Sequence, residues 1–194
     1  GPDQTICANA DTLTLTGTST TGAGIWTTSG TGTFIPTATT LNGLYAASTT
    51  DTTAGFVMLT LTSTGGCVPI ADNMTVTITP APVVTAGLDQ IICAGTQTVS
   101  LSGTVGSGAS TGIWSTTGTG TFTPTATVLG ATYNITSADS TFGNVTLILT
   151  STVNGNCFAV SDAINLFIIQ PPTVNAGPDQ TICALSPIQL NGSS

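Results

Sequence analysis

The segment Asn73-Met-Thr-Val-Thr-Ile-Thr79 alternates apolar and hydroxyl side chains along its whole length. A period of two residues places Met74, Val76 and Ile78 on one face of an extended strand and the threonines on the other. The stretch Val57–Thr64 repeats this pattern, and no stretch shows the 3.6-residue period of an amphipathic helix. A sheet with one apolar and one hydroxyl-bearing face packs on one side only. The sequence therefore predicts an all-β fold.

A second signal is internal repetition. Gly-Pro-Asp-Gln-Thr-Ile-Cys at 1–7 recurs at 177–183, and the near copy Gly-Leu-Asp-Gln-Ile-Ile-Cys occupies 87–93. This spacing exceeds the roughly 20–50 residues of a solenoid or propeller period, so each repeat is expected to be a domain. The predicted domains are 1–82, 83–172 and 173–194, the last being the start of a third repeat. Relative to repeat 1, repeat 2 has small insertions near 105–110 and 153–156, which are expected to be loop tips.

Short strands separated by turn residues fill each repeat. In repeat 1 the predicted strands are Gln4–Cys7, Thr12–Thr16, Gly24–Thr28, Gly32–Ile35, Asn42–Ala46, Val57–Thr64 and Asn73–Thr79. This number of strands in one domain, with a Trp near the third, predicts tandem immunoglobulin-like β-sandwiches. Pro80-Ala-Pro82 and Pro171-Pro172 are expected to end a strand and to stiffen the link to the next domain.

The composition excludes several classes of function. The chain has no Lys, Arg or His, and its eight acidic residues give a net charge of −8. A chain without basic side chains cannot form the cationic surface that nucleic acids require, so it is not expected to bind them. No apolar run approaches the ~20 residues of a membrane-spanning helix. There is no His or Lys to activate a nucleophile, and the carboxylates recur in register, so we predict that the protein is not an enzyme.

Five cysteines divide between the repeats. One disulfide per repeat is the simplest pairing, which predicts Cys7–Cys67 and Cys93–Cys157 and places the partner of Cys183 beyond residue 194. Buried free thiols are the alternative, and a zinc site is less well supported because the chain has no His and no Cys-x-x-Cys. Disulfides indicate an oxidising, extracellular compartment.

Three aspartates, Asp3, Asp89 and Asp179, lie at the predicted domain entrances. They are candidate Ca²⁺ ligands, and no other cofactor is expected; the alternative is that each caps a turn. A separate feature is the outward face of the last strand of repeat 2, where Phe167 and Ile169 replace threonines of repeat 1. These two side chains are a candidate contact with a neighbouring domain or chain, the alternative being ordinary surface variation.

The opening heptapeptide, Gly-Ile-Trp at 24–26 and 112–114, and Gly-Thr-Gly-Thr-Phe at 30–34 and 118–122 resemble the PKD-like and Ig-like repeats of large Bacteroidota cell-surface adhesins, a family that includes the SprB-type gliding adhesins. The resemblance implies type IX secretion, a cell-surface location and adhesion to solid surfaces or polysaccharide, with a role in gliding motility. It implies no catalytic site. The O-glycosylation signal of that phylum is similar to the sequences at 11–13, 51–53 and 139–141, which makes Thr12, Thr52 and Ser140 candidate sites. The last two are expected in a loop between strands.

Two functions follow from this sequence. The first is a repeat segment of a giant extracellular adhesin, in which the domains form a stalk with weak binding distributed along it, and the partners are neighbouring repeats and surface polysaccharide. The second is a structural subunit of an extracellular filament, with identical chains as partners. A carbohydrate-binding module is less well supported, because sugar platforms need exposed aromatic rings and Trp26 and Trp114 are expected in the cores.

Overall fold

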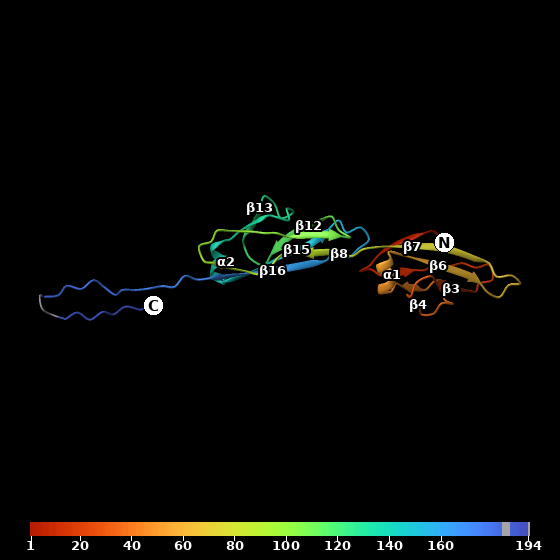
Figure 1. The fold of residues 1–194 in the computed structure, drawn as a ribbon, viewed down its shortest axis with the longest axis horizontal. Helices are drawn as coiled ribbons and strands as arrows, with labels where there is room; N and C mark the ends of the chain where they lie inside the picture. The colour runs from red at the N-terminus through yellow and green to blue at the C-terminus, as the bar shows by residue number, and fades with distance from the viewer. Residues whose placement is uncertain (184–186, 194) are drawn as a thin grey trace.

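The computed structural model describes residues 1–183 and 187–193. Two β-sandwiches follow one another along the long axis of the molecule, and an extended C-terminal segment leaves the second (Figure 1). The predicted all-β class of tandem immunoglobulin-like sandwiches is confirmed. Within the described residues, no helix has the length and apolar character that crossing a membrane requires.

The first sandwich consists of a four-stranded and a three-stranded sheet, with strand orders β1-β7-β6-β3 and β2-β5-β4. Strand β1 runs parallel to β7, whereas the other pairs are antiparallel. This is the strand arrangement of an immunoglobulin-like Greek key. Its elements are β1 (Gln4–Cys7), β2 (Thr12–Thr14), β3 (Gly24–Thr28), β4 (Thr33–Ile35), β5 (Leu44–Ala46), α1 (Thr49–Ala54), β6 (Phe56–Ser63) and β7 (Ala71–Thr79).

The second sandwich repeats both sheets, with strand orders β12-β15-β16-β9 and β10-β14-β13, and adds a pair of strands, β8 with β11. Its elements are β8 (Pro82–Thr85), β9 (Gln90–Cys93), β10 (Thr98–Ser100), β11 (Thr104–Ser107), β12 (Thr111–Thr116), β13 (Thr121–Thr123), β14 (Thr132–Asn134), α2 (Ser137–Phe142), β15 (Asn144–Thr152) and β16 (Ser161–Ile169). Pro82, which the sequence placed in the linker, begins β8.

Each sandwich encloses its own apolar core. Met74, Val76 and Ile78 are buried as the alternation predicts, and burying a side chain of this size contributes about 1.5–3 kcal/mol. The two tryptophans lie in the cores, also as predicted, and each indole N–H is satisfied by a backbone carbonyl: Trp26 donates to Leu41 at 3.2 Å and Trp114 to Leu129 at 3.1 Å.

Two short helices, α1 and α2, occupy the segments that the sequence analysis assigned to loops, so that assignment was wrong. Ser48 and Thr136 are the N-caps, each in a reciprocal capping box with the third helical residue. Gly55 and Gly143 end the helices in the left-handed conformation. A helix of six residues spans less than two turns, which is too short to show a hydrophobic period, but the Ser/Thr-x-x-acidic pattern was readable.

Candidate functional site: the joint between the sandwiches

A disulfide joins the two sandwiches. Cys7, the last residue of β1, is bonded to Cys157 in the loop between β15 and β16, with their Cα atoms 5.0 Å apart. Cys67, Cys93 and Cys183 carry free, exposed thiols. The predicted pairs Cys7–Cys67 and Cys93–Cys157 are therefore both wrong.

Strand geometry explains the error. Cys7 lies opposite Thr79 at the end of β7, whereas Cys67 precedes the start of β7 at Ala71. A strand advances about 3.3 Å per residue, so the nine residues of β7 hold the two cysteines at opposite ends of the sandwich. Disulfides need Cα atoms within about 7 Å. Within one repeat the two cysteines are too far apart, but successive repeats bring the end of one close to the beginning of the next.

Side-chain hydrogen bonds reinforce this joint. The amide of Asn9 donates to the carbonyl oxygen of Phe158 at 3.0 Å, and its oxygen accepts the Phe158 N–H at 3.1 Å. Asn156 donates to the carbonyl oxygen of Thr5 at 3.1 Å. Each such bond contributes about 0.5–1.5 kcal/mol net. The side chain of Asn9 thus forms two hydrogen bonds with the backbone of the second sandwich, as a residue of a neighbouring strand would.

The linker itself is packed against the second sandwich. The N–H of Gly108 donates to Ala81 at 3.4 Å, and the Pro80 carbonyl oxygen lies 3.4 Å from the sulfur of Cys157. A Cβ on Gly108 would collide with the Pro80 carbonyl oxygen. Gly108 and Asn156 belong to the two insertions that distinguish repeat 2. Both insertions were predicted to be loop tips. The one at 153–156 follows β15, as predicted, but residues 105–107 of the other belong to β11, so that prediction was wrong for them. Contact of the insertions with the joint was not predictable from the sequence.

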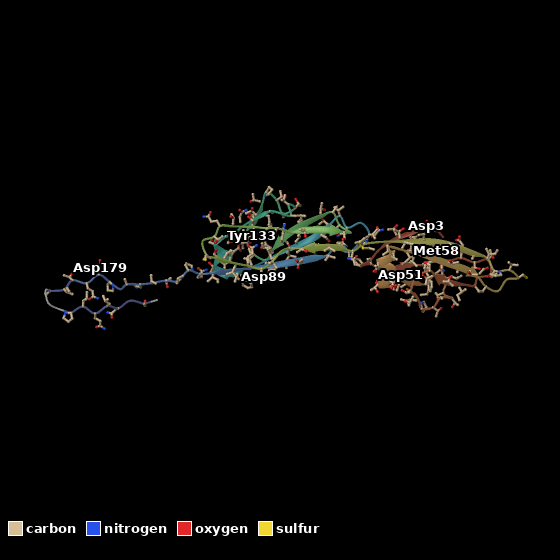
Figure 2. The ribbon with its side chains drawn as sticks, in the orientation of Figure 1. Asp3, Asp51, Met58, Asp89, Tyr133 and Asp179 are labelled. Carbon is tan, nitrogen blue, oxygen red and sulfur yellow. A yellow bond between two sulfur atoms is a disulfide. The ribbon has the colours of Figure 1, made fainter. Side chains whose placement is uncertain are left out.

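Asp3 and Asp89 each accept a hydrogen bond from the last strand of their own sandwich. Asp3 accepts the N–H of Thr75 and Asp89 that of Asn165, both at 2.8 Å. Asp179 lies in the C-terminal segment, apart from both (Figure 2). In the part of the chain that the structure describes, no three carboxylate, thiol or imidazole groups come together as a metal site. The structure thus gives these two aspartates a role in holding the first strand to the last.

A buried carboxylate, Asp51, organises one end of the first sandwich. Its Oδ1 accepts the N–H of Thr31 at 2.9 Å. Its Oδ2 accepts the N–H of Gly32 at 2.9 Å, the hydroxyl of Tyr45 at 2.7 Å and the N–H of Ser48 at 3.0 Å. Burial alone would raise the pKa of this carboxyl, but the hydrogen bonds outweigh it and hold the pKa below its usual value. Burial, together with Asp51, raises the pKa of Tyr45 to about 12.

The second sandwich repeats this network around Asp139. Asp139 accepts bonds from the Thr119 N–H at 2.7 Å, the Tyr133 hydroxyl at 2.9 Å and the Thr136 N–H at 3.1 Å. The network explains the Gly-Thr-Gly-Thr-Phe motif, because a Cβ on its first glycine, Gly30 or Gly118, would collide with the carboxylate. The motif is therefore structural. The register of these two aspartates is visible in the sequence, but their hydrogen-bond partners are not.

The outward face of β16 exposes apolar side chains. Phe167 and Ile169 are 41% and 56% exposed, and Ile91, which lies opposite Phe167 on β9, is 72% exposed. The predicted contact of Phe167 and Ile169 with a neighbouring domain or chain stays a prediction.

The three candidate glycosylation sites have different surroundings. Thr12 is exposed at the start of β2. Thr52 and Ser140 lie in α1 and α2, where their hydroxyls donate to Thr49 and Thr136 at 3.0 and 3.2 Å. The aspartates that precede them are buried, so an enzyme that reads Asp and hydroxyl together would have to act before folding.

No family model matches the chain, and no curated protein matches it. Solved structures with a similar course of the chain include human protocadherin-24 EC1-2 (TM-score 0.40, 13% identity, 87% of this chain and 95% of that one). They also include titin domains I67-I69 (0.42, 11%, 89% and 64%) and Drosophila N-cadherin EC1-3 (0.38, 14%, 87% and 65%). At these scores and identities no functional conclusion follows from the likeness.

Proposed function

We propose that the chain is a repeat segment of a large secreted cell-surface adhesin, in which immunoglobulin-like domains form a stiffened stalk with weak adhesion distributed along it. The observation that carries this proposal is the joint. Cys7–Cys157, Asn9 with Phe158, and the packed linker hold successive domains in one orientation. A fixed orientation gives reach to an array of small domains, and an extracellular, oxidising location suits the disulfide.

The arrangement extends to the other cysteines. Cys7, Cys93 and Cys183 occupy the same position in successive repeats, as do Cys67 and Cys157. The first cysteine of each repeat then bonds to the second cysteine of the following one, so Cys93 and Cys183 pair with later repeats. In this arrangement the domains are 1–82 and 83–172, with a third repeat from 173. In this proposal the array is not an enzyme.

Calcium bound at Asp3, Asp89 and Asp179 would add to the stability of the array. An unchanged melting midpoint in EDTA would exclude calcium as a structural element.

Two measurements test the stalk. Small-angle scattering of the chain and of Cys157→Ser compares how widely the two sandwiches vary in relative orientation; Cys93→Ser, which removes a free thiol, is the matched control. We expect a broader distribution for Cys157→Ser only, and an equal distribution in all three proteins would refute a stiff joint. For location, antibodies against the chain should label intact cells of the bacterium that makes it. Label that appears only after permeabilisation would exclude the surface role.

The second candidate is a filament subunit, favoured by the exposed apolar strip of Phe167, Ile169 and Ile91. Apolar groups on one sheet face can pack against a second copy of the chain. Electron microscopy of native material separates the two functions, because a stalk gives single thin strands and a filament gives ordered lateral or helical packing. The finer features implied by the adhesin resemblance, namely type IX secretion, gliding, polysaccharide binding and O-glycosylation of Thr12, Thr52 or Ser140, belong to the first function.

A further inference from the structure

The loop between β15 and β16 makes the side-chain contacts of the second sandwich with the first. Asn156 donates to the carbonyl oxygen of Thr5 at 3.1 Å, Cys157 forms the disulfide, and the N–H of Phe158 donates to Asn9 at 3.1 Å. The conformation of this loop therefore determines how the two sandwiches fit together.

A strained turn begins the loop. Val153 has a φ of 55°, a left-handed conformation that is strained for a β-branched residue. The carbonyl oxygen of Asn154 accepts the N–H of Cys157 at 2.9 Å, which closes a turn with Gly155 at its first central position. Gly155 has a φ of 59°, which favours glycine there. The fold thereby places a glycine directly after Asn154.

An asparagine followed by glycine is prone to deamidation, because glycine has no Cβ to hinder the approach of its backbone nitrogen to the preceding side chain. The nitrogen of Gly155 loses its proton and bonds to Cγ of Asn154, while the Cγ–Nδ2 bond breaks and ammonia leaves with the proton. Water then opens the five-membered imide at either of two C–N bonds. One opening gives aspartate, and the other gives isoaspartate, in which the main chain runs through Cγ. No oxidant or reductant takes part.

The hydrogen bonding around Asn154 favours this reaction. Within the described residues, the N–H of Gly155 has no protein acceptor, so no bond is lost when its proton leaves. The side-chain amide of Asn154 donates only to the carbonyl oxygen of Ser151, at 3.4 Å, which is long for a hydrogen bond. Its Oδ1 is buried and has no donor in the described part of the chain. The reacting groups are thus weakly held.

The product does not fit the same place. A carboxylate at position 154 turns an acceptor, instead of the NH₂ donor, toward the carbonyl oxygen of Ser151, and its other oxygen has no donor to stabilise the charge. The chain has no Lys, Arg or His to pair with it. In isoaspartate an extra main-chain atom also shifts the residues that follow. Either product therefore leaves the buried position and displaces Asn156 and Phe158.

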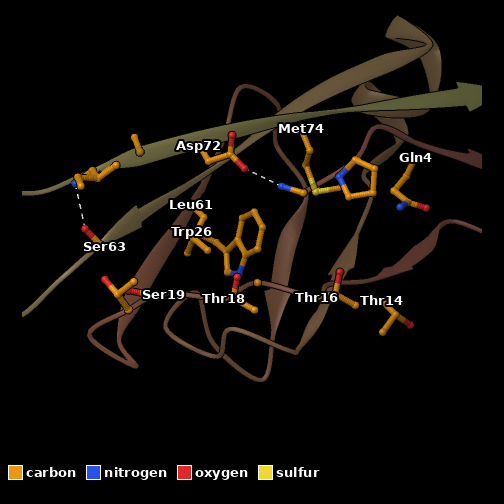
Figure 3. Close-up of a pocket in the computed structure, with 16 residues that line it drawn as sticks. Gln4, Thr14, Thr16, Thr18, Ser19, Trp26, Leu61, Ser63, Asp72 and Met74 are labelled. Atoms are coloured by element: carbon orange, nitrogen blue, oxygen red, sulfur yellow. Dashed lines mark hydrogen bonds and ion pairs between the residues drawn. The ribbon is translucent and has the colours of Figure 1, made fainter.

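The corresponding loop of the first sandwich lacks this dipeptide. The two loops are closed by the same contact. The hydroxyl of Ser151 accepts the N–H of Val160 at 2.9 Å, and the hydroxyl of Ser63 accepts the N–H of Ile70 at 2.9 Å (Figure 3). The first loop, however, reads Thr-Gly-Gly-Cys at 64–67, without an asparagine. The reactive dipeptide thus belongs to the insertion that distinguishes repeat 2.

We propose that Asn154 is a site of spontaneous deamidation and that its conversion loosens the joint between the sandwiches. The disulfide keeps the sandwiches connected, but the hydrogen bonds of Asn156 and Phe158 to the first sandwich are lost. The change goes in one direction and needs only water, so a joint that is stiff when newly folded becomes flexible with age. This inference is independent of whether the chain forms a stalk or a filament.

Peptide mapping of the aged chain tests the site. The full chain, with its exposed thiols alkylated, is kept in mildly alkaline buffer, and its pepsin fragments are analysed for aspartate and isoaspartate by mass spectrometry. Asn42-Gly43 is the internal control, because Gly43 is buried and its carbonyl oxygen accepts the N–H of Leu15 at 2.9 Å. Ring closure there must first free this backbone, so Asn154 should convert at least roughly tenfold faster. Equal rates overturn the inference, as does an unchanged Asn154 when the exposed Asn191-Gly192 has converted.

Two variants test the effect on the joint. Asn154→Asp is one product of the reaction, and Asn154→Gln keeps an amide whose longer side chain closes a ring more slowly. Exchange of the Phe158 N–H, followed by NMR, should be at least roughly tenfold faster in Asn154→Asp and in the aged native chain than in the fresh native chain, with β12 unchanged. The aged and fresh forms of Asn154→Gln should exchange alike. Native protection of Phe158 in Asn154→Asp would overturn the loosening, and equal loosening in aged Asn154→Gln would overturn Asn154 as its cause.

Discussion

Replacing Asp51 by Asn tests whether the buried carboxylate holds the first sandwich together. The four donors around it are unequally divided, with Thr31 at Oδ1 and Gly32, Tyr45 and Ser48 at Oδ2. Because an amide has one oxygen and one NH₂ group, the least costly orientation places NH₂ at the Oδ1 position. The N–H of Thr31 then faces a donor and loses its only partner there.

The magnitude follows from these contacts. Thr31 is exposed and its bond to Asp51 is partly buried, so losing the partner of this N–H costs near the lower end of about 1–3 kcal/mol. The three remaining bonds weaken as they lose the charge on the acceptor. Relief of the buried charge offsets part of this loss. We expect the sandwich to lose about 3 kcal/mol, which is roughly a hundredfold in its opening equilibrium.

Hydrogen exchange read by mass spectrometry resolves the two sandwiches. In Asp51→Asn, exchange in β6 should accelerate by about this factor while β15 is unchanged, and Asp139→Asn should reverse the pattern. Asp11→Asn makes the same chemical change at an exposed position and should leave both strands within about 0.5 kcal/mol of the native chain. Equal protection of β6 in Asp51→Asn and the native chain would refute the assigned role of the carboxylate.

Three further predictions follow from the structure. Because the pKa values of Asp51 and Asp139 are lowered by folding, their contribution to stability is complete above the unfolded pKa of about 3.9 and is lost as the pH falls through the folded pKa. The melting midpoint should therefore drop as the pH falls below about 4, and a double Asn variant should show a flatter profile there. Gly108→Ala should destabilise the joint by about 1–3 kcal/mol, because its Cβ meets the Pro80 carbonyl oxygen. Gly106→Ala, whose Cβ meets no atom within 4 Å, should leave the joint unchanged. Small-angle scattering of the two variants checks this, and identical scattering curves would contradict a packed linker. Phe167→Thr should reduce any lateral association seen by light scattering, with Thr77→Ser as a control on the same face of repeat 1, and unchanged association would remove Phe167 as a contact.

Most of the fold was readable because alternation is a local property. Met74, Val76 and Ile78 point inward wherever the strand lies, so the predicted segment Asn73–Thr79 falls within β7 (Ala71–Thr79). The helices were missed because six residues are too few to show a period. Their capping residues carried the only local signal, and threonine is so common in this chain that the signal is hard to separate from background.

The disulfide at the joint could not be predicted from the sequence for a different reason. Pairing Cys7 with Cys67 assumes that residues of one repeat are near in space, but a strand carries its two ends to opposite poles of a sandwich. Which poles meet depends on how successive domains stack, and no residue pattern within one repeat specifies this. The site of the buried carboxylate was partly predictable. Asp51, Tyr45 and the Gly-Thr-Gly motif recur in register in the sequence, but only the folded structure shows that they contact one another.

The Cys7–Cys157 disulfide also sets the path that mechanical load takes through the molecule. Tension applied at the two ends runs from Gly1 to Cys7, crosses the sulfur–sulfur bond and continues from Cys157 into β16. The segment between the two cysteines, with a sequence separation of 150 residues, is bypassed and carries none of the load. Without the disulfide, this segment could unfold under load and extend to about 500 Å. Pulling can shear β1 and β16 from their sheets, but the rest of both sandwiches extends only after the disulfide is reduced, so the redox state of one bond decides whether the molecule is a short tether or a long one.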